Sequence, residues 1–135
     1  MVDTSALLAI LLDEPHAAWC AERMSEAAGD LAMSTVNLAE TLVLVADRHP
    51  AALQAVEEEV VSSGAIRFVP PDTAQARAAA AARLRFPLNL GDCFAYALAV
   101  AEKTPLLTLD RDLLATGHPV LTPKRSPSSP RSRRS

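Results

Sequence analysis

Residues 105–117 read PLLTLDRDLLATG, where an apolar run of strand character meets two aspartates and then an apolar run of helical character. Asp110 and Asp112 stand on either side of Arg111 at this junction. An aspartate that follows a strand is a favoured helix N-cap, because its side chain accepts a hydrogen bond from an otherwise unpaired N–H. Such an aspartate is equally suited to ligate a metal ion. The local sequence leaves both interpretations open, and the rest of the chain has to decide between them.

Strand-like and helical patterns alternate along the whole chain. Strands are expected at residues 1–4, 31–35, 65–69, 105–109 and 119–121. Helices are expected at residues 5–12, 15–28, 35–48, 51–63, 73–85 and 91–103, with a short one ending near residue 115. This alternation predicts an α/β fold, a three-layer α/β/α sandwich with a short, mainly parallel central sheet. Ligands bind such sheets at the carboxyl ends of the strands.

The composition favours one cytosolic domain. The chain has 135 residues, half of them apolar and only 4% aromatic, which is enough for one core and too few residues for two domains. No window holds the roughly 18 apolar residues of a membrane span, and an acid near the N-terminus argues against a signal peptide. Cys20 and Cys93 lack metal-ligand spacing, so we expect small buried hydrophobes in a reducing compartment.

The charge is distributed unevenly between a folded part and a tail. Five of the thirteen basic residues and none of the sixteen acids lie in residues 123–135, so residues 1–122 carry a net charge of −8. A segment rich in Pro, Ser and Arg buries too little apolar surface to fold, and we expect a disordered, solvated tail. Contact of this tail with nucleic-acid phosphates is the weaker interpretation.

Four acids occupy equivalent places in the predicted fold. Asp3 follows the first strand, Asp110 follows the fourth, Asp92 opens a central helix, and Glu40 lies near the start of the helix after the second strand. All four therefore map to one rim of the sheet. Each has a local alternative, because Asp3 and Asp110 are suited to cap helices and Asp92 suits the positive end of a helix dipole.

Glu40 has a local alternative only if its helix begins late. Asn37 and Glu40 have the spacing of a capping box, which requires the helix to begin at Val36 or later. Ser34 or Thr35 is an equally good cap, and then Glu40 lies a full turn inside the helix, where capping does not explain a glutamate.

Taken together, four converging acids require a counter-charge. Two carboxylates about 5 Å apart repel by roughly 3 kcal/mol at an effective dielectric near 20, so a cation or protons must offset the cluster. Oxygen ligands select a hard divalent ion such as Mg²⁺ or Mn²⁺. Zinc is disfavoured because the three histidines, His16, His49 and His118, are scattered along the chain.

Four segments carry a resemblance to a known family: VDTSALL at residues 2–8, NLAE at 37–40, LGDCFAYALA at 90–99 and LLTLDRDLL at 106–114. In this order they resemble the motifs of PIN-domain ribonucleases, most of all the VapC toxins of toxin–antitoxin pairs, and the match covers nearly all of residues 1–122. The resemblance implies a Rossmann-like sandwich and Mg²⁺- or Mn²⁺-dependent endonucleolytic cleavage of structured RNA such as tRNA or rRNA. It also implies a VapB-type antitoxin as partner and a homodimer.

The resemblance also assigns roles to residues. Asp3, Glu40, Asp92 and Asp110 become a catalytic, metal-binding acidic quartet. Ser5 and Thr108 are placed to orient a carboxylate or water, and Asp112 is placed just outside the direct ligands. One departure is the short start, because only Met1 and Val2 precede Asp3, so either the strand is unusually short or the start is set late.

Substrate binding is the least determined feature. Arg83, Arg85 and Arg111 lie near the predicted rim and are candidates for phosphate contacts, although arginines on an alanine-rich helix are more often solvated. The few aromatic residues favour recognition of RNA shape over base stacking. A receiver domain or a haloacid-dehalogenase-type phosphatase requires acid spacings after the first strand that are missing here. A catalytically inactive PIN-like interaction module remains the alternative.

Overall fold

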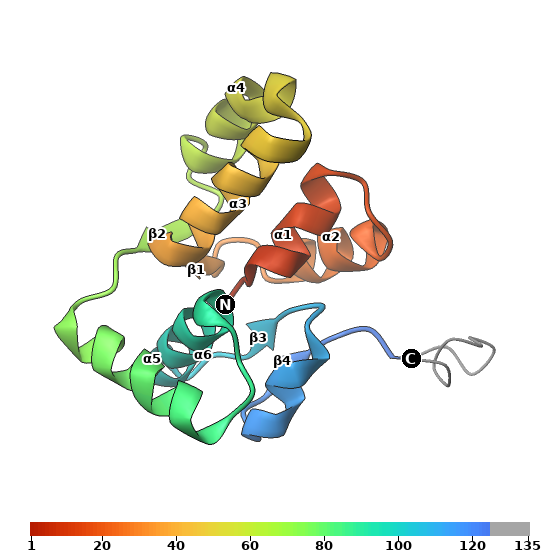
Figure 1. The fold of residues 1–135 in the computed structure, drawn as a ribbon. Coiled ribbons are helices and arrows are strands. Elements are labelled where there is room, and N and C mark those ends of the chain that lie inside the picture. The colour runs from red at the N-terminus through yellow and green to blue at the C-terminus, as the bar shows by residue number, and fades with distance from the viewer. Residues whose placement is uncertain (125–135) are drawn as a thin grey trace.

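The computed structural model describes residues 1–124, so the predicted tail lies outside the described residues apart from its first two positions. The helices are α1 (Thr4–Leu11), α2 (Ala17–Glu26), α3 (Thr35–Arg48), η1 (Pro50–Ala52), α4 (Leu53–Val56), η2 (Glu57–Val61), α5 (Thr73–Arg85), α6 (Leu90–Glu102) and η3 (Arg111–Thr116) (Figure 1). The strands are β1 (Ala32–Ser34), β2 (Arg67–Val69), β3 (Leu106–Leu107) and β4 (Val120–Leu121).

The N-terminal residues join two pairs of parallel strands into one sheet. β1 pairs with β2 and β3 with β4, both in parallel. Val2 forms a parallel bridge with Leu107 of β3, and its N–H donates to the Ala32 carbonyl of β1 at 2.8 Å. The order across the sheet is therefore β2, β1, the first segment, β3, β4. The chain order reverses between the first segment and β3, which is where α/β sheets open a crevice for ligands.

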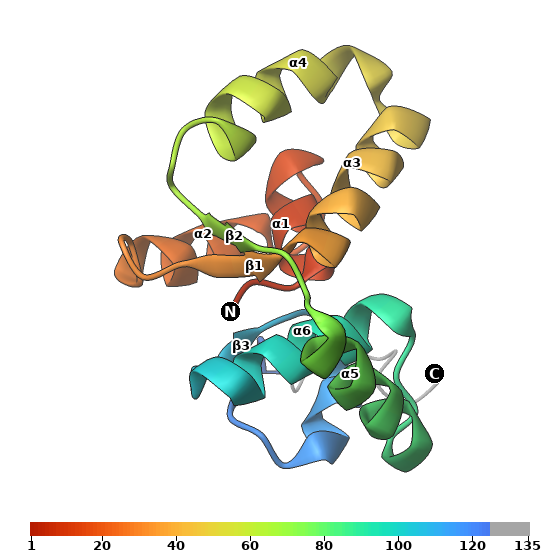
Figure 2. The same ribbon diagram turned by 90° about the vertical axis from the view of Figure 1, so that its left-hand side faces the viewer.

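Side chains along the sheet alternate between two apolar layers. One residue of each central strand packs with α5 and α6: Met1, Ala32 and Leu106. The next residue of each packs in a second cluster with α1 and α2: Val2, Met33 and Leu107. This period of two shows that both faces of the sheet are covered. Figure 2 shows α3 and α4 above β1 and β2, and α5 and α6 below these two strands. The predicted three-layer sandwich is confirmed, with strands of two or three residues.

Two helical segments differ from the prediction by more than one residue at an end. α2 begins at Ala17 and not at Pro15, because His16 has a positive φ of 74° and turns the chain before the helix begins. The single helix expected at residues 51–63 is a 3₁₀ turn, a short α-helix and the π-helical turn η2. Pro50 opens this segment, and the widened turn carries three exposed glutamates, Glu57, Glu58 and Glu59.

Composition-based expectations can be compared with the described chain. Cys20 and Cys93 are free and buried, as expected. Within residues 1–124, no helix is long and apolar enough to cross a membrane.

Candidate active site

Asp3 leaves the sheet at the point where the strand order reverses, and it is almost completely buried, with 2% of its surface exposed. Its Oδ2 accepts hydrogen bonds from the hydroxyl of Thr108 at 2.7 Å and from that of Ser5 at 3.1 Å. Burial raises the pKa of the Asp3 carboxyl, and the two hydroxyl donors oppose that rise. The two hydroxyl residues that were predicted to lie beside the quartet therefore both hold Asp3: Ser5 from α1 and Thr108 from the segment that follows β3.

Helix capping explains only one of the four acids. Asp3 is the N-cap residue of α1, but within the described residues its side chain makes no capping hydrogen bond. Asn89 caps α6 by accepting from the N–H of Asp92 at 2.8 Å, so Asp92 is not itself the cap. Asp110 does cap η3, accepting from the N–H of Asp112 at 2.9 Å. Asp110 is therefore a helix cap through Oδ1, and capping leaves its other carboxylate oxygen for a different role.

Glu40 lies inside α3 and not in a capping box. Ser34 caps α3 by accepting from the Val36 N–H at 3.2 Å, so the helix begins early. The carboxylate of Glu40 accepts a 2.7 Å hydrogen bond from the Thr4 hydroxyl and lies directly on the backbone of Gly91. A Cβ at Gly91 would be only 2.0 Å from Oε1 of Glu40. The absent side chain of Gly91 therefore makes the space in which this carboxylate meets the first turn of α6.

Asp92 and Asp110 form the second half of the cluster. Asp92 is 4% exposed. Burial, a hydrogen bond with Asp110 and the charges of Asp3 and Asp110 together raise the pKa of Asp92 to about 9. The surroundings of Asp92 therefore favour its protonated form more than those of an ordinary carboxyl do. Glu40 in turn raises the pKa of Asp3, so the four predicted acids form one continuous electrostatic cluster.

Among residues 1–124, no basic side chain forms an ion pair with the four acids. The ion pairs of residues 1–124 all involve other acids: Glu14, Glu22, Glu26 and Glu102. Hydroxyls, one side-chain amide and the backbone N–H of Asp112 are the donors that hold the quartet. Within the described chain, the negative charge of the quartet is therefore met by hydrogen-bond donors and not by an ion pair.

Asn37 and Thr4 belong to the site although the sequence did not predict a role for them there. Asn37 is fully buried and its amide nitrogen lies 3.4 Å from Oδ1 of Asp3 and 3.4 Å from Oε1 of Glu40. Thr4 is the hydroxyl donor to Glu40. A signal was available for Asn37, because it precedes Glu40 by three residues and therefore lies on the same side of α3.

Asp112 is exposed, and its carboxylate makes no hydrogen bond in the described chain. It contacts Asp110 through its backbone N–H alone. Its place beside the cluster agrees with a position outside the direct ligands, and the role itself stays a prediction.

The three predicted arginines are placed differently. All are exposed. Arg83 lines a groove together with Cys93, the residue after Asp92. The guanidinium of Arg85 lies 4.8 Å from the ring centroid of Phe86, and Arg111 donates to the carbonyl of Pro123 at 3.2 Å. Arg83 therefore shares a groove with the first turn of α6, and its contact with a substrate stays a prediction.

The donor set fits a hard divalent cation in kind. All four acids offer carboxylate oxygens, the ligands that Mg²⁺ and Mn²⁺ prefer. In residues 1–124, no three acid, histidine or cysteine side chains are already spaced as metal ligands. The acids instead meet as neighbours, Asp3 with Glu40 and Asp92 with Asp110. Glu40 and Asp110 are only half-buried, so these two side chains have room to turn toward a shared ion.

Comparisons with known proteins agree on one family. The sequence model of the PIN-domain family matches residues 1–119 of this chain. Ribonuclease VapC28 of Mycobacterium tuberculosis is 35% identical over 125 residues, covering 87% of this chain and 93% of that protein. Ribonuclease VapC of Mycolicibacterium smegmatis is 37% identical over 117 residues, covering 79% and 88%.

Solved structures share the fold at lower sequence identity. A toxin–antitoxin complex from Klebsiella pneumoniae has a TM-score of 0.75 at 18% identity, covering 93% of this chain and 98% of that one. Mycobacterium tuberculosis VapC20, described as a sarcin-ricin loop cleaving toxin, has a TM-score of 0.73 at 20% identity, covering 90% and 98%. These likenesses agree with the three-layer sandwich described above.

Proposed function

We propose that this chain, which belongs to the PIN-domain family and within it to the VapC ribonucleases, is a cytosolic toxin that cuts structured RNA, such as tRNA or rRNA, with Mg²⁺ or Mn²⁺. Asp3, Glu40, Asp92 and Asp110 hold the ion. The observation that carries the proposal is the convergence of these four acids at the reversal of the strand order, with the pKa of Asp92 raised to about 9. We assign this activity to residues 1–122.

The quartet and the residues around it have separate tasks in this proposal. When bound, the divalent ion acidifies a water and neutralises the phosphate. Thr108 and Ser5 fix the orientation of Asp3 through its Oδ2. Asp92 and Asp110 would hold the ion through their carboxylate oxygens, because metal ligands must be deprotonated. Arg83 offsets the repulsion between the acidic domain and the RNA backbone.

Cleavage by the isolated protein tests the function. Purified protein freed of antitoxin is expected to cut tRNA or rRNA with Mg²⁺ or Mn²⁺ and to stop with EDTA. Asp92→Asn is expected to abolish cleavage, because a neutral amide replaces a ligand oxygen of the cluster. Asp47→Asn is the matched control, since Asp47 is exposed on α3 and outside the cluster. Full cleavage by Asp92→Asn would refute the proposed mechanism.

The alternative is a PIN-like interaction module without catalysis. It predicts that the protein neither binds Mn²⁺ nor cuts RNA under any metal condition, while it still binds a partner. Titration calorimetry with Mn²⁺ separates the two functions without reference to the correct RNA.

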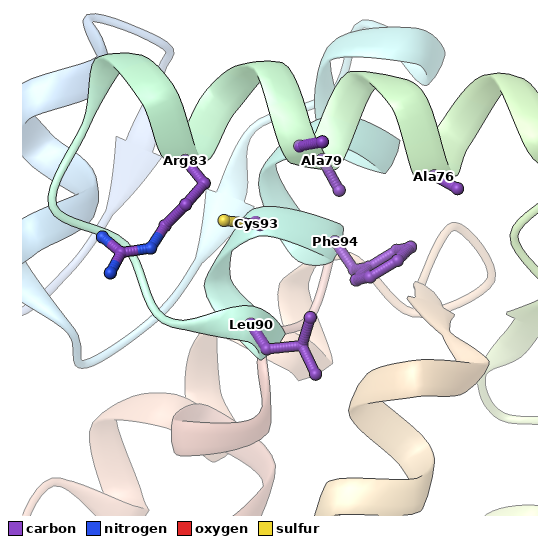
Figure 3. A pocket seen from close by; sticks show the side chains of 7 residues that line it. Ala76, Ala79, Arg83, Leu90, Cys93 and Phe94 are labelled. Carbon is purple, nitrogen blue, oxygen red and sulfur yellow. The ribbon is translucent and has the colours of Figure 1, made fainter.

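We further propose that a second copy of the chain covers an apolar surface beside the quartet. Two grooves share Leu90: one of about 520 Å³ with Val36 and Val43 of α3, and one of about 340 Å³ with Phe94 and the alanines of α5. Figure 3 shows Leu90 and Phe94 projecting from the start of α6 beside those alanines. Leu90 is 70% exposed and Val43 59% exposed, and exposed apolar surface of this kind marks an interface.

The mass in solution tests this homodimer. Sedimentation is expected to give twice the chain mass for the wild type and the chain mass for Leu90→Glu, which places a charge in the centre of the interface. Leu84→Glu is the control, because Leu84 is 89% exposed and lines neither groove. A monomeric wild type would refute the homodimer.

A VapB-type antitoxin is the partner that we propose for inhibition. The toxin–antitoxin complex among the structural neighbours supports this assignment. The large apolar residues of α1 and α2 are buried or half-buried, so these helices present no stripe of large exposed apolar side chains to that partner. A small upstream reading frame for a DNA-binding protein, which copurifies with this chain and blocks cleavage, is the expected finding.

A further inference from the structure

We propose that Asn37 and Thr4 act together as a positioning pair, which fixes Glu40 against α6 and so sets the spacing of the acids that bind the metal. The inference deepens the proposed function and rests on it. Neither residue is required to touch RNA or the metal ion itself. Their role follows from the hydrogen bonds between three separate segments of the chain.

Asn37 connects those three segments through one nitrogen atom. Its Nδ2 donates to the hydroxyl oxygen of Thr4 at 3.0 Å and to the carbonyl of Gly91, the residue before Asp92, at 3.1 Å. An amide nitrogen has two hydrogens, so these two short bonds use both of them. The longer contacts of 3.4 Å to Asp3 and Glu40 add electrostatic attraction.

The hydrogen bonds of the pair run in one direction, from Asn37 through Thr4 to Glu40. The Thr4 hydroxyl accepts from Asn37 and donates its own proton to Oε1 of Glu40 at 2.7 Å. Hydrogen bonds in such a chain polarise one another, and the last one is strengthened by the charge of the carboxylate. Oδ1 of Asn37 has no partner in residues 1–124. The side chain is therefore held by what it donates, and turning the amide over would place its oxygen against two carboxylates.

The pair has a direct effect on the geometry of the quartet. Asn37 lies on α3, Thr4 directly follows Asp3, and Gly91 directly precedes Asp92. Each bond of the pair therefore ties the segment of one acid to that of another. Residues that orient metal ligands typically change metal affinity or activity 10- to 100-fold when they are lost.

Variants of Thr4 give the sharpest test, because valine keeps the shape of threonine and removes only the hydroxyl. Thr4→Val and Asn37→Ala are expected to lower Mn²⁺ affinity in titration calorimetry about 10- to 100-fold. Cleavage at saturating Mn²⁺ is expected to lose kcat with KM for RNA unchanged, because the RNA contacts remain. Thr4→Ser restores the hydroxyl and is expected to recover Mn²⁺ affinity.

Thr41→Val is the matched control. Thr41 is fully buried on the same helix and donates at 2.8 Å to the backbone carbonyl of Asn37, outside the acid cluster. It is expected to change stability without changing Mn²⁺ affinity. If Thr41→Val lowers Mn²⁺ affinity as much as Thr4→Val, the effect is general damage to α3 and the inference is wrong.

The remaining outcomes separate the inference from the proposed function. A wild-type protein that binds no Mn²⁺ overturns the proposed function and the positioning pair with it. A wild-type protein that binds Mn²⁺, with Thr4→Val binding equally well, overturns the positioning pair alone. If Asn37→Ala does not fold, the comparison of Thr4→Val with Thr4→Ser decides the question.

Discussion

Gly91→Ala is expected to separate activity from folding. The added Cβ would lie 2.0 Å from Oε1 of Glu40, whereas ordinary contact begins at 3.4 Å, so the carboxylate must retreat by about 1.4 Å. Glu40 is a flexible, half-buried side chain and can make this movement. In doing so it loses the 2.7 Å hydrogen bond from Thr4. A displacement of about 1 Å in a catalytic site costs roughly 10²-fold in rate, which is the loss expected here.

The effect on stability is much smaller because two terms oppose each other. Losing the bond between Thr4 and the Glu40 carboxylate costs about 1.5–3 kcal/mol. Replacing a helical glycine by alanine contributes about 0.5–1 kcal/mol in the other direction. Gly91→Ala is therefore expected to lower the free energy of unfolding by about 1 kcal/mol, which leaves the protein folded.

A double-mutant cycle with Glu40→Ala shows whether the effect acts through Glu40. Urea unfolding measures stability, and a gel assay with Mn²⁺ measures RNA cleavage. In the Glu40→Ala background the clash is gone, so Gly91→Ala is expected to stabilise the protein by about 0.5–1 kcal/mol. Wild-type cleavage by Gly91→Ala, or equal destabilisation in both backgrounds, would refute the placement of Glu40 on α6.

Three further predictions concern the other acids. The pKa of Asp92 is raised from 3.8 to about 9, so between these pH values the folded state keeps a proton that the unfolded state releases. The free energy of unfolding of the metal-free protein is therefore expected to fall as the pH rises through this range. Urea unfolding at several pH values measures this, and the stability of Asp92→Asn should depend less on pH than that of the wild type. Thr108→Val removes the 2.7 Å donor to buried Asp3 and is expected to cost about 1–3 kcal/mol of unfolding free energy and to slow cleavage. Asp112→Asn is expected to retain most RNA cleavage, and a loss as large as that of Asp92→Asn would make Asp112 a direct ligand.

The rim of acids was predictable because it depends on chain order alone. Asp3 and Asp110 each follow a parallel strand, and parallel strands end at one edge of a sheet, so alternation of strands and helices was enough to bring them together. Glu40 was predictable for a different reason, since an early cap at Ser34 places it inside α3. The lengths of the strands were not predictable. Two or three paired residues give a weak period-two pattern, and the N-terminal segment pairs through Val2 alone.

The supports of the quartet could not be predicted from local patterns. Asn37 has four acceptors, and three of them come from segments distant in the sequence. Gly91 carries no positive φ, the usual sign of a required glycine. Its role depends on the approach of a side chain from another helix, and only the packing of α3 against α6 reveals it.

The donors around the quartet are uncharged, so they orient the carboxylates without neutralising them. An arginine or lysine beside Asp3 would lower its pKa and would occupy the place of a metal ion. Hydroxyls and an amide orient the same oxygens while they leave most of the negative charge in place. Burial, together with the hydrogen bond to Asp110 and the repulsion between the acids, then raises the pKa of Asp92. The uncharged donors and the negative charge of the quartet thus depend on each other. Donors that neutralised the acids would remove their attraction for the metal ion.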